Sequence, residues 1–311
     1  MKYIDLHCDT ASRILYEHEG LKKNNFKVDI GKLRKGQCLA QVFAFFIDAG
    51  KIDNTMSEFE VMYNKFKEEL EENKEDIELV TNLTELNEIE KKGKIGAFLS
   101  IEEGEALGKH IENVEKVYKK GIRFVTLTWN YKNSFGYPND GFRYKDKGLT
   151  KFGMQMVLEM ERLGILPDAS HLSDAGFYDL IKVCKKPFIV THSNSRKQTL
   201  HSRNLTDEMI KLLADKGGVL GINFCSKFIG KSQISLIEDM VRHIKHIRNV
   251  GGIDVISLGS DFDGIENEVE IKDASEFNKL EIALKNEGFK NEEIEKIYYK
   301  NALRLFKETL R

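Results

Sequence analysis

Proline is almost absent from this sequence, with only three residues among 311. No segment is rich in proline, glycine or serine, which argues against a flexible linker between separate domains. Low-complexity tracts and internal repeats are also lacking. We therefore expect a single domain over residues 1–311, long enough to bury a full apolar core.

An excess of charge of one sign is lacking too. The chain has 48 basic and 50 acidic residues, a formal charge of -2. Proteins that bind nucleic acid or anionic membranes usually carry a basic patch and a basic excess. Neither nucleic acid nor a membrane surface is therefore an expected partner.

Long apolar runs are missing, and none reaches the roughly 20 residues that span a bilayer. The first ten residues resemble a strand rather than a signal peptide, so a cytoplasmic location is expected. The four cysteines are far apart and have no CxxC spacing, which favours buried thiols over disulfides or a zinc–thiolate site. They are Cys8, Cys38, Cys184 and Cys225.

Short apolar runs and charged segments of helical period alternate along the whole chain. Eight runs are expected to be strands, at residues 3–9, 38–47, 95–101, 122–128, 165–171, 187–192, 218–223 and 254–261. Between them, apolar residues spaced three and four apart predict helices at 57–73, 111–120, 150–163, 174–184, 206–216 and 234–250. The tail, 274–311, is expected to form two more. This order predicts an α/β fold of the TIM type, a (β/α)8 barrel, with a doubly wound sheet as the alternative.

The first predicted strand carries polar residues in an unusual pattern. Because successive strand side chains point to opposite faces, one face would hold Tyr3, Asp5, His7 and Asp9. The other face would hold Ile4, Leu6 and Cys8, directed outward against helices. Ionisable groups inside a barrel need a partner or a metal.

Residues with metal-ligand or acid–base chemistry occur at the ends of five predicted strands. The carboxyl ends of barrel strands form the active site, so these side chains are expected to converge. They are His7, Asp9, Glu102, His171, His192 and Asp261. Imidazole and carboxylate suit zinc, with manganese or cobalt also compatible. Six such residues exceed the needs of one tetrahedral ion, whereas two ions roughly 3.5 to 4 Å apart, bridged by a carboxylate such as Glu102, would use them.

Seven short motifs appear in order along the chain. They are HxD at 7–9, IEEG at 101–104, SHLS at 170–173, THS at 191–193, SRN at 202–204, GSDFDG at 259–264 and NALRLF at 301–306. In this order and spacing the sequence resembles the membrane (renal) dipeptidase family of zinc peptidases, within the metal-dependent amidohydrolase-like barrels. The resemblance covers essentially the whole chain.

This resemblance implies a role for each matching residue. His7 and Asp9 would hold one zinc ion, His171 and His192 the other, and Glu102 would bridge them. Asp261 would act as the acid and base that handles the proton of the attacking water. Arg203 would bind the free C-terminal carboxylate of a dipeptide, for which a planar guanidinium is well shaped. Acceptance of a C-terminal D-residue and a homodimer are further expectations from the resemblance.

One position departs from the family pattern. After TLT the renal enzymes have a histidine that contacts the substrate, whereas this chain has Trp129 followed by Asn130. Tryptophan can line a pocket or donate one hydrogen bond, but it cannot act as an imidazole. We expect Trp129 and Asn130 to contact the substrate, and stabilisation of the oxyanion to come from the metals or from Asn130.

These features bear on three functions. A binuclear zinc dipeptidase is favoured. The alternative is an amidohydrolase-type enzyme acting on a lactone, cyclic amide or phosphoester, which Trp129 keeps open. A non-catalytic barrel for binding or assembly is the third, and the complete ligand set together with Asp261 argues against it.

The other chemically active residues are expected to be structural. His18, His110, His243 and His246 are predicted at the surface, His201 in a loop, and Asp263 beside the site as support for it. The charged segment 65–78 is predicted to be a solvated helix face. The aromatic connection 129–148 is expected to form a wall over the site.

Overall fold

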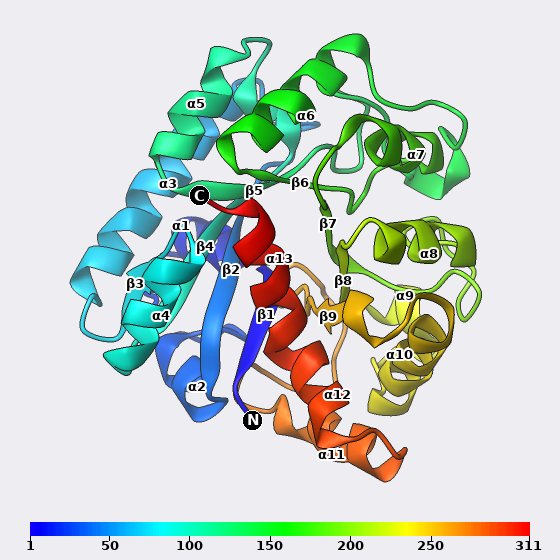
Figure 1. The fold of residues 1–311 in the computed structure, drawn as a ribbon. Helices are drawn as coiled ribbons and strands as arrows, with labels where there is room; N and C mark the ends of the chain where they lie inside the picture. Colours follow the sequence, from blue (N-terminus) through cyan, green and yellow to red (C-terminus); the bar gives the residue numbers. More distant parts are fainter.

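The computed structural model describes residues 1–311, and a closed barrel of parallel strands lies at its centre (Figure 1). Each strand pairs with its neighbours around the ring, and β2 pairs with β4 to close it. The (β/α)8 fold and all eight predicted strands are confirmed. The barrel strands are β1 (Tyr3–Cys8), β2 (Cys38–Phe46), β4 (Ile95–Glu102), β5 (Ile122–Thr126), β6 (Leu166–Asp168), β7 (Ile189–Ser193), β8 (Val219–Ile222) and β9 (Ile256–Leu258).

Helices cover the outside of the barrel (Figure 1). The six predicted helices correspond to α3 (Thr55–Glu72), α5 (Glu112–Lys119), α6 (Lys151–Leu163), α7 (Asp174–Val183), α8 (Asp207–Asp215) and α10 (Ile237–Gly251). Thr150, Ser173 and Thr206 begin α6, α7 and α8 by accepting a hydrogen bond from the backbone N–H three residues on. None of the helices is both long and apolar enough to cross a bilayer.

Four further helices were not predicted. They are α1 (Thr10–Glu17), α2 (Ile30–Lys35), α4 (Leu83–Lys91) and α9 (Ser226–Ile229). Each is shorter than the 11 to 18 residues over which a helical period is read, although α5 and α8, which were predicted, are hardly longer. Their formation therefore depends on packing against the barrel more than on a sequence pattern.

The charged segment 65–78 is not the single solvated helix face that we predicted. Helix α3 ends at Glu72, and the chain then forms a short extra strand, β3 (Ile77–Leu79), which pairs with the first half of β4. Within α3, Glu69 is buried and accepts hydrogen bonds from the Leu21 backbone N–H and the Lys65 ammonium. A buried carboxylate with two donors is stable where an unpaired one would not be.

The C-terminal tail forms three helices instead of two: α11 (Asn278–Asn286), α12 (Asn291–Glu295) and α13 (Asn301–Thr309), with a π-helical turn at Lys296–Lys300. Figure 1 shows α13, in red, lying across one end of the barrel. Phe306 of α13 packs against Phe98 of β4 and Phe124 of β5, with ring centroids 4.8 and 5.6 Å apart. These contacts close the end opposite the carboxyl ends of the strands.

Strand β1 does not follow the alternation that the sequence predicts. Ile4 and Leu6 belong to the cluster that contains Phe98, Phe124 and Phe306. Side chains from strands on different sides of a closed barrel can share a cluster only inside it. The prediction that Ile4 and Leu6 face outward is therefore wrong.

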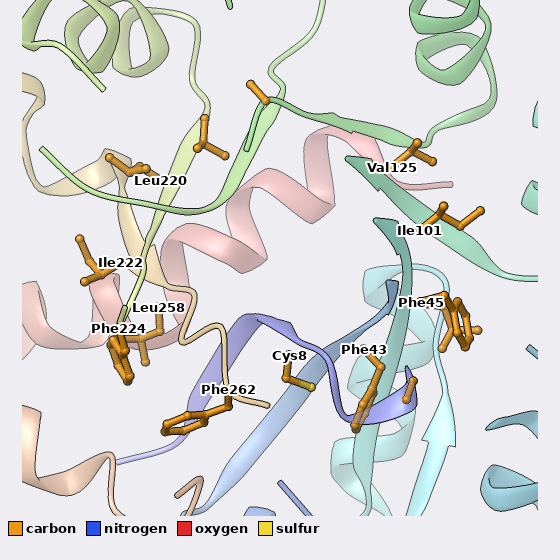
Figure 2. Packing of buried hydrophobic residues seen from close by; sticks show 14 of the residues in the cluster. Cys8, Phe43, Phe45, Ile101, Val125, Leu220, Ile222, Phe224, Leu258 and Phe262 are labelled. Atoms are coloured by element: carbon orange, nitrogen blue, oxygen red, sulfur yellow. The ribbon is translucent and has the colours of Figure 1, made fainter. Parts of the chain in front are cut away.

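The reason is a bulge in β1. Asp5 pairs with Gln41 and Cys8 with Phe43, so Leu6 and His7 together lie opposite one residue of β2. A bulge redirects side chains and commonly occurs next to active sites. It places Leu6 in the barrel core and His7 in the site, while Cys8 packs outside near Phe43 and Phe262, as predicted (Figure 2).

Strand β7 also has a bulge, which explains why two nearby positions are glycine. Val190 pairs with Leu220 and Ser193 with Ile222, so Thr191 and His192 share one position opposite Gly221. A Cβ on Gly221 would lie 2.0 Å from the Thr191 carbonyl oxygen, and one on Gly259 would lie 1.9 Å from it. Only glycine fits at these two positions.

Replacing Gly259 with alanine is expected to lower the free energy of unfolding by about 3 kcal/mol, because the clash is with backbone rather than with a movable side chain. Urea unfolding measures the loss. Gly20→Ala is the matched control, since its nearest neighbour would lie 3.5 Å from the new Cβ. Equal stability of the two variants would contradict the close approach of Thr191.

Candidate metal and catalytic site

A cavity of about 790 Å³ opens at the carboxyl ends of the strands. The predicted site residues that line it are Asp9, Glu102, Trp129, Asn130, His171, Arg203 and Asp261. The remaining two, His7 and His192, are fully buried behind it and contact Glu102. The structure thus brings together every residue that the sequence selected.

Glu102, at the end of β4, lies between two groups of ligand-type residues. Its Oε1 is 3.1 Å from Nε2 of His171 and 3.6 Å from Nε2 of His192. Its Oε2 is 3.3 Å from Nε2 of His7. The two oxygens of this carboxylate therefore face different imidazoles, as a bridging ligand requires.

The second group surrounds His7. The Oδ2 atom of Asp9 is 3.4 Å from Nε2 of His7, and Oδ1 of Asp261 is 3.9 Å from it. Both ring nitrogens of His7 and Oδ1 of Asp9 are buried without a hydrogen-bond partner. Buried polar atoms are normally paired, so these atoms indicate a missing ligand.

Hydrogen bonds fix the tautomers of the other two imidazoles. Nδ1 of His171 donates to Oδ1 of Asn130 over 3.1 Å. Nδ1 of His192 donates to Thr191 Oγ1 over 2.8 Å, and that hydroxyl donates to Asp168 over 2.6 Å. Both Nε2 atoms therefore carry a lone pair, in the arrangement usual for metal-bound histidines.

Asp168 was missed by the sequence analysis. It is a fully buried carboxylate on β6 that also accepts hydrogen bonds from Thr126 Oγ1 and from the backbone N–H groups of Ser170 and Thr191. An aspartate inside a predicted buried strand was the available signal, because an ionised group there needs several donors.

Together these contacts fit divalent cations. The lone pairs on Nε2 of His171 and His192 face each other across 3.1 Å, beside the Glu102 carboxylate. Such a concentration of acceptors without donors is unfavourable unless a cation lies among them. His171, His192 and Glu102 could hold one ion, and His7, Asp9 and Glu102 another.

The electrostatic environment keeps these histidines neutral. Burial, assisted by the nearby Arg203 charge, lowers the pKa of His171 to about 4. Burial and the positive charge of His7 hold the pKa of His192 well below its ordinary value. Neutral imidazole is the form that binds metal.

The pKa values of Asp261 and His7 are shifted upward instead. Burial raises the pKa of Asp261 to about 6. For His7, burial alone would lower the pKa, but Glu102 and Asp9 together raise it well above the ordinary value. In this part of the site, carboxylates thus favour a proton on His7. A bound cation would take the place of that proton.

Three of the expected strand-end residues lie beyond their strands, and one of them is Asp9, which follows the end of β1 at Cys8. Strand β6 ends at Asp168 and β9 at Leu258, so His171 and Asp261 occupy the following turns. Both have left-handed backbone, with φ of 66° and 62°. Such conformations cost about 1 to 3 kcal/mol and cluster at functional sites.

Arg203 lies in the loop after β7 and is 5% exposed. Its Nη2 donates to the His192 carbonyl over 3.4 Å, whereas Nε and Nη1 have no partner. The guanidinium lies over the ring of Phe228, with 5.4 Å to the centroid. A cavity-lining arginine with two unpaired donor atoms is suited to bind an anionic group.

Trp129 and Asn130 have different surroundings. Trp129 packs edge-on against Phe46, with centroids 4.7 Å apart, and forms an aromatic side of the cavity. Asn130 binds His171 through Oδ1. Of the connection 129–148, only these two residues line the cavity, so the predicted wall is much smaller than expected. Phe135, for example, is fully buried against Phe152.

The other histidines lie as predicted with one exception. His18 and His110 are exposed, His201 is in a loop, and His246 is partly exposed beside Asp207. His243, predicted at the surface, is fully buried and hydrogen-bonded to backbone at both ring nitrogens. The surface prediction is wrong because α10 packs this side chain against a long loop instead of presenting it to solvent.

The predictions for the cysteines and for Asp263 agree with the structure. All four cysteines are buried and free. Asp263 lies beside the site, where it accepts hydrogen bonds from Thr10 Oγ1 and the Lys27 backbone N–H.

A closed α/β barrel with imidazoles and carboxylates at its carboxyl end defines the class of barrel metallohydrolases. The family model of the membrane dipeptidases, peptidase family M19, matches residues 1–311, and the chain belongs to this family. It is 30% identical over 298 residues to an uncharacterised dipeptidase of Schizosaccharomyces pombe, covering 90% of this chain and 72% of the relative. The chain is thus a metallopeptidase that hydrolyses dipeptides.

Solved structures share the fold. Dipeptidase AC, a metallopeptidase of family M19, has a TM-score of 0.92 at 23% identity, over 99% of this chain and 98% of that one. A metallopeptidase from Rhodobacter sphaeroides, liganded with a phosphinate mimic of L-Ala-D-Ala, has a TM-score of 0.90 at 24% identity, over 99% of each chain.

Proposed function

We propose that the chain is a binuclear zinc dipeptidase that requires the free C-terminal carboxylate of its substrate. The observation that carries the proposal is the position of Glu102, whose two carboxylate oxygens face separate groups of imidazoles. One ion would need only one such group. A second supporting observation is the buried guanidinium of Arg203, whose Nε and Nη1 have no hydrogen-bond partner.

His171, His192 and Glu102 would hold one zinc ion, and His7, Asp9 and Glu102 the other. Bound zinc would lower the pKa of a water molecule toward about 7 and polarise the peptide carbonyl. Asn130 orients His171 by accepting a hydrogen bond from its Nδ1, and Thr191 orients His192 in the same way. Asp168 fixes Thr191 by accepting a hydrogen bond from its hydroxyl. Manganese or cobalt would suit the same donors.

Asp261 would carry the proton. Asn223 Nδ2 donates to its Oδ2 over 2.8 Å, which fixes the carboxylate while Oδ1 faces His7. A base with a raised pKa can accept a proton from water and return it to the leaving amine near neutral pH. Asp261 is therefore assigned both steps.

Arg203 would bind the substrate carboxylate through Nε and Nη1, the two donor atoms that have no protein partner. A longer peptide has no carboxylate at that place, which restricts the substrate to dipeptides. Trp129 would line the cavity beside the substrate. The phosphinate mimic of L-Ala-D-Ala bound by the Rhodobacter sphaeroides relative supports tolerance of a D-residue at the C-terminal position. The cytoplasmic location and the homodimer stay predictions from the sequence.

The first experiment measures zinc content and hydrolysis of L,L and L,D dipeptides on one preparation. Two zinc ions per chain with cleavage of both is the expected result. One ion per chain would contradict the binuclear site, and two ions without dipeptide cleavage would favour the lactone, cyclic amide or phosphoester alternative.

Arg203→Ala tests the carboxylate contact. It is expected to lower kcat/KM for a free dipeptide by roughly 10²-fold, because a charge-assisted bidentate contact is lost, and to change the amidated dipeptide little. The ratio of the two kcat/KM values is the measurement. An unchanged ratio would show that Arg203 does not bind the carboxylate.

A further inference from the structure

The loop that carries Arg203 is built as a closed unit. It runs from Asn194 to Leu205, and its two ends are joined where the Leu205 N–H donates to the Asn194 carbonyl over 2.9 Å. The Arg196 N–H donates back to the Leu205 carbonyl over 2.7 Å. The position of Arg203 therefore depends on what holds this unit against the barrel.

His243 of α10 is one of those supports. It is fully buried, and the Ser195 backbone N–H donates to its Nδ1 over 3.0 Å. Its Nε2 lies 3.0 Å from the carbonyl oxygen of Ile229. Since Nδ1 accepts a hydrogen bond, the proton is on Nε2, which donates to Ile229. One neutral imidazole thus connects the start of the loop to the end of α9.

Helix α9 is a second support of the loop, and it contacts Arg203 directly. Phe228, next to Ile229, provides the ring beneath the guanidinium. Asn204, next to Arg203, donates through Nδ2 to the carbonyls of Phe228 and Thr199, over 2.8 and 2.9 Å. The arginine loop and α9 are consequently joined by the Asn204 hydrogen bond and by the bridging His243. Arg203 and His201 add ring contacts to Phe228, at 5.4 and 4.6 Å from its centroid.

We infer that His243 is a positioning residue for substrate binding, which holds the Arg203 loop and the Phe228 segment in the register that presents the guanidinium to the substrate carboxylate. The inference rests on the proposed function, because it takes Arg203 as the carboxylate site. His243 does not line the cavity and contacts none of the proposed metal ligands. An apolar residue could fill its volume but would leave the buried Ser195 N–H without a partner. The Ile229 carbonyl would keep only its hydrogen bond from Arg242 Nη2, and the link between the loop and α9 through this side chain would be lost.

His243→Phe is the test, with zinc content measured on each preparation. KM for a free dipeptide is expected to rise about 10-fold or more, because small displacements of a binding group reduce affinity strongly. The value of kcat is expected to stay within about twofold, since the groups that handle the reacting atoms are untouched. The preference for free over amidated dipeptides is expected to fall in the same direction as in Arg203→Ala.

His246→Phe is the matched control. It lies one turn further along α10 and binds Asp207 rather than the loop, so its KM and its preference for free dipeptides should equal those of the wild type. His243→Gln is the conservative variant, because its amide offers one acceptor and one donor. It should keep the rise in KM to about threefold or less.

The outcomes separate the two ideas. If Arg203→Ala leaves the free-to-amidated ratio unchanged, the proposed role of Arg203 is wrong and His243 has nothing to position. If Arg203→Ala lowers the ratio but His243→Phe behaves like the wild type, the inference about His243 alone is wrong. If His243→Phe does not fold, His243→Ala decides, because it also removes the acceptor of the Ser195 N–H. A wild-type KM and ratio in that variant would overturn the inference, and a raised KM with unchanged kcat would support it.

Discussion

Replacement of Glu102 by glutamine is expected to lower kcat by about 10⁴-fold, with loss of at least one metal ion per chain. The substitution keeps the size of the side chain but replaces one carboxylate oxygen by an NH₂ group and removes the charge. In the structure both oxygens face Nε2 atoms of histidines, at 3.1 and 3.3 Å. An amide can place an oxygen toward only one of these groups, so the two groups can no longer share this ligand.

Glu103→Gln is the control for this prediction. Glu103 is the next residue and equally buried, but it accepts hydrogen bonds from the backbone of Glu105 and Trp129 and lies outside the ligand groups. Its variant is expected to keep the wild-type metal content. Zinc analysis and kcat on the same preparations provide the comparison. A Glu102→Gln enzyme with two zinc ions and near-normal kcat would exclude a bridging role.

The convergence of the predicted site residues could be expected from the sequence because it follows from barrel geometry. Once eight alternating strands and helices are recognised, the residues after each strand must meet at one end. Approximate strand ends are sufficient for this prediction. It therefore succeeded for His171 and Asp261, although both lie in turns beyond the observed strands.

The details that depend on local register could not be predicted. A strict alternation placed Ile4 and Leu6 outside the barrel, whereas the bulge in β1 places them inside and still directs His7 into the site. A bulge adds one residue to a pairing between distant segments, and no local pattern records it. Gly221 in β8 and Gly259 after β9 were visible in the sequence. The close Thr191 carbonyl that requires glycine at both positions was not.

Long-range burial was the other source of error. His243 has the polar character of a surface helix residue, yet its partners are the backbone of Ser195 and Ile229, which are 48 and 14 residues away. Arg203 could be expected only from the family resemblance, because a loop arginine has no distinctive spacing. Single polar residues that serve distant backbone groups leave no periodic signal for a sequence argument to use.

Replacement of Asp261 by asparagine is expected to lower kcat by about 10² to 10⁴-fold while the metal content stays that of the wild type. Asp261 is the more distant carboxylate of its group, at 3.9 Å from His7 Nε2 against 3.4 Å for Asp9, so its loss should affect proton transfer more than metal binding. Asparagine can still accept the hydrogen bond from Asn223 but cannot take a proton from water. Asp263→Asn, two residues on, is expected to change kcat by less than about tenfold. Loss of zinc from Asp261→Asn would instead make Asp261 a ligand.

The same substitution should stabilise the metal-free protein. Burial raises the pKa of Asp261 to about 6 from the ordinary 3.8, so between these pH values the folded chain keeps a proton that the unfolded chain has lost. The contribution of Asp261 to the free energy of unfolding is therefore fully present below pH 3.8 and is lost as the pH rises through 6. Chelator-treated Asp261→Asn is therefore expected to exceed the wild type in free energy of unfolding by about 3 kcal/mol at pH 7.5 and by about half that at pH 5. Urea unfolding at both pH values measures it, and equal stabilities at pH 7.5 would mean that ionised Asp261 is well solvated in the metal-free site.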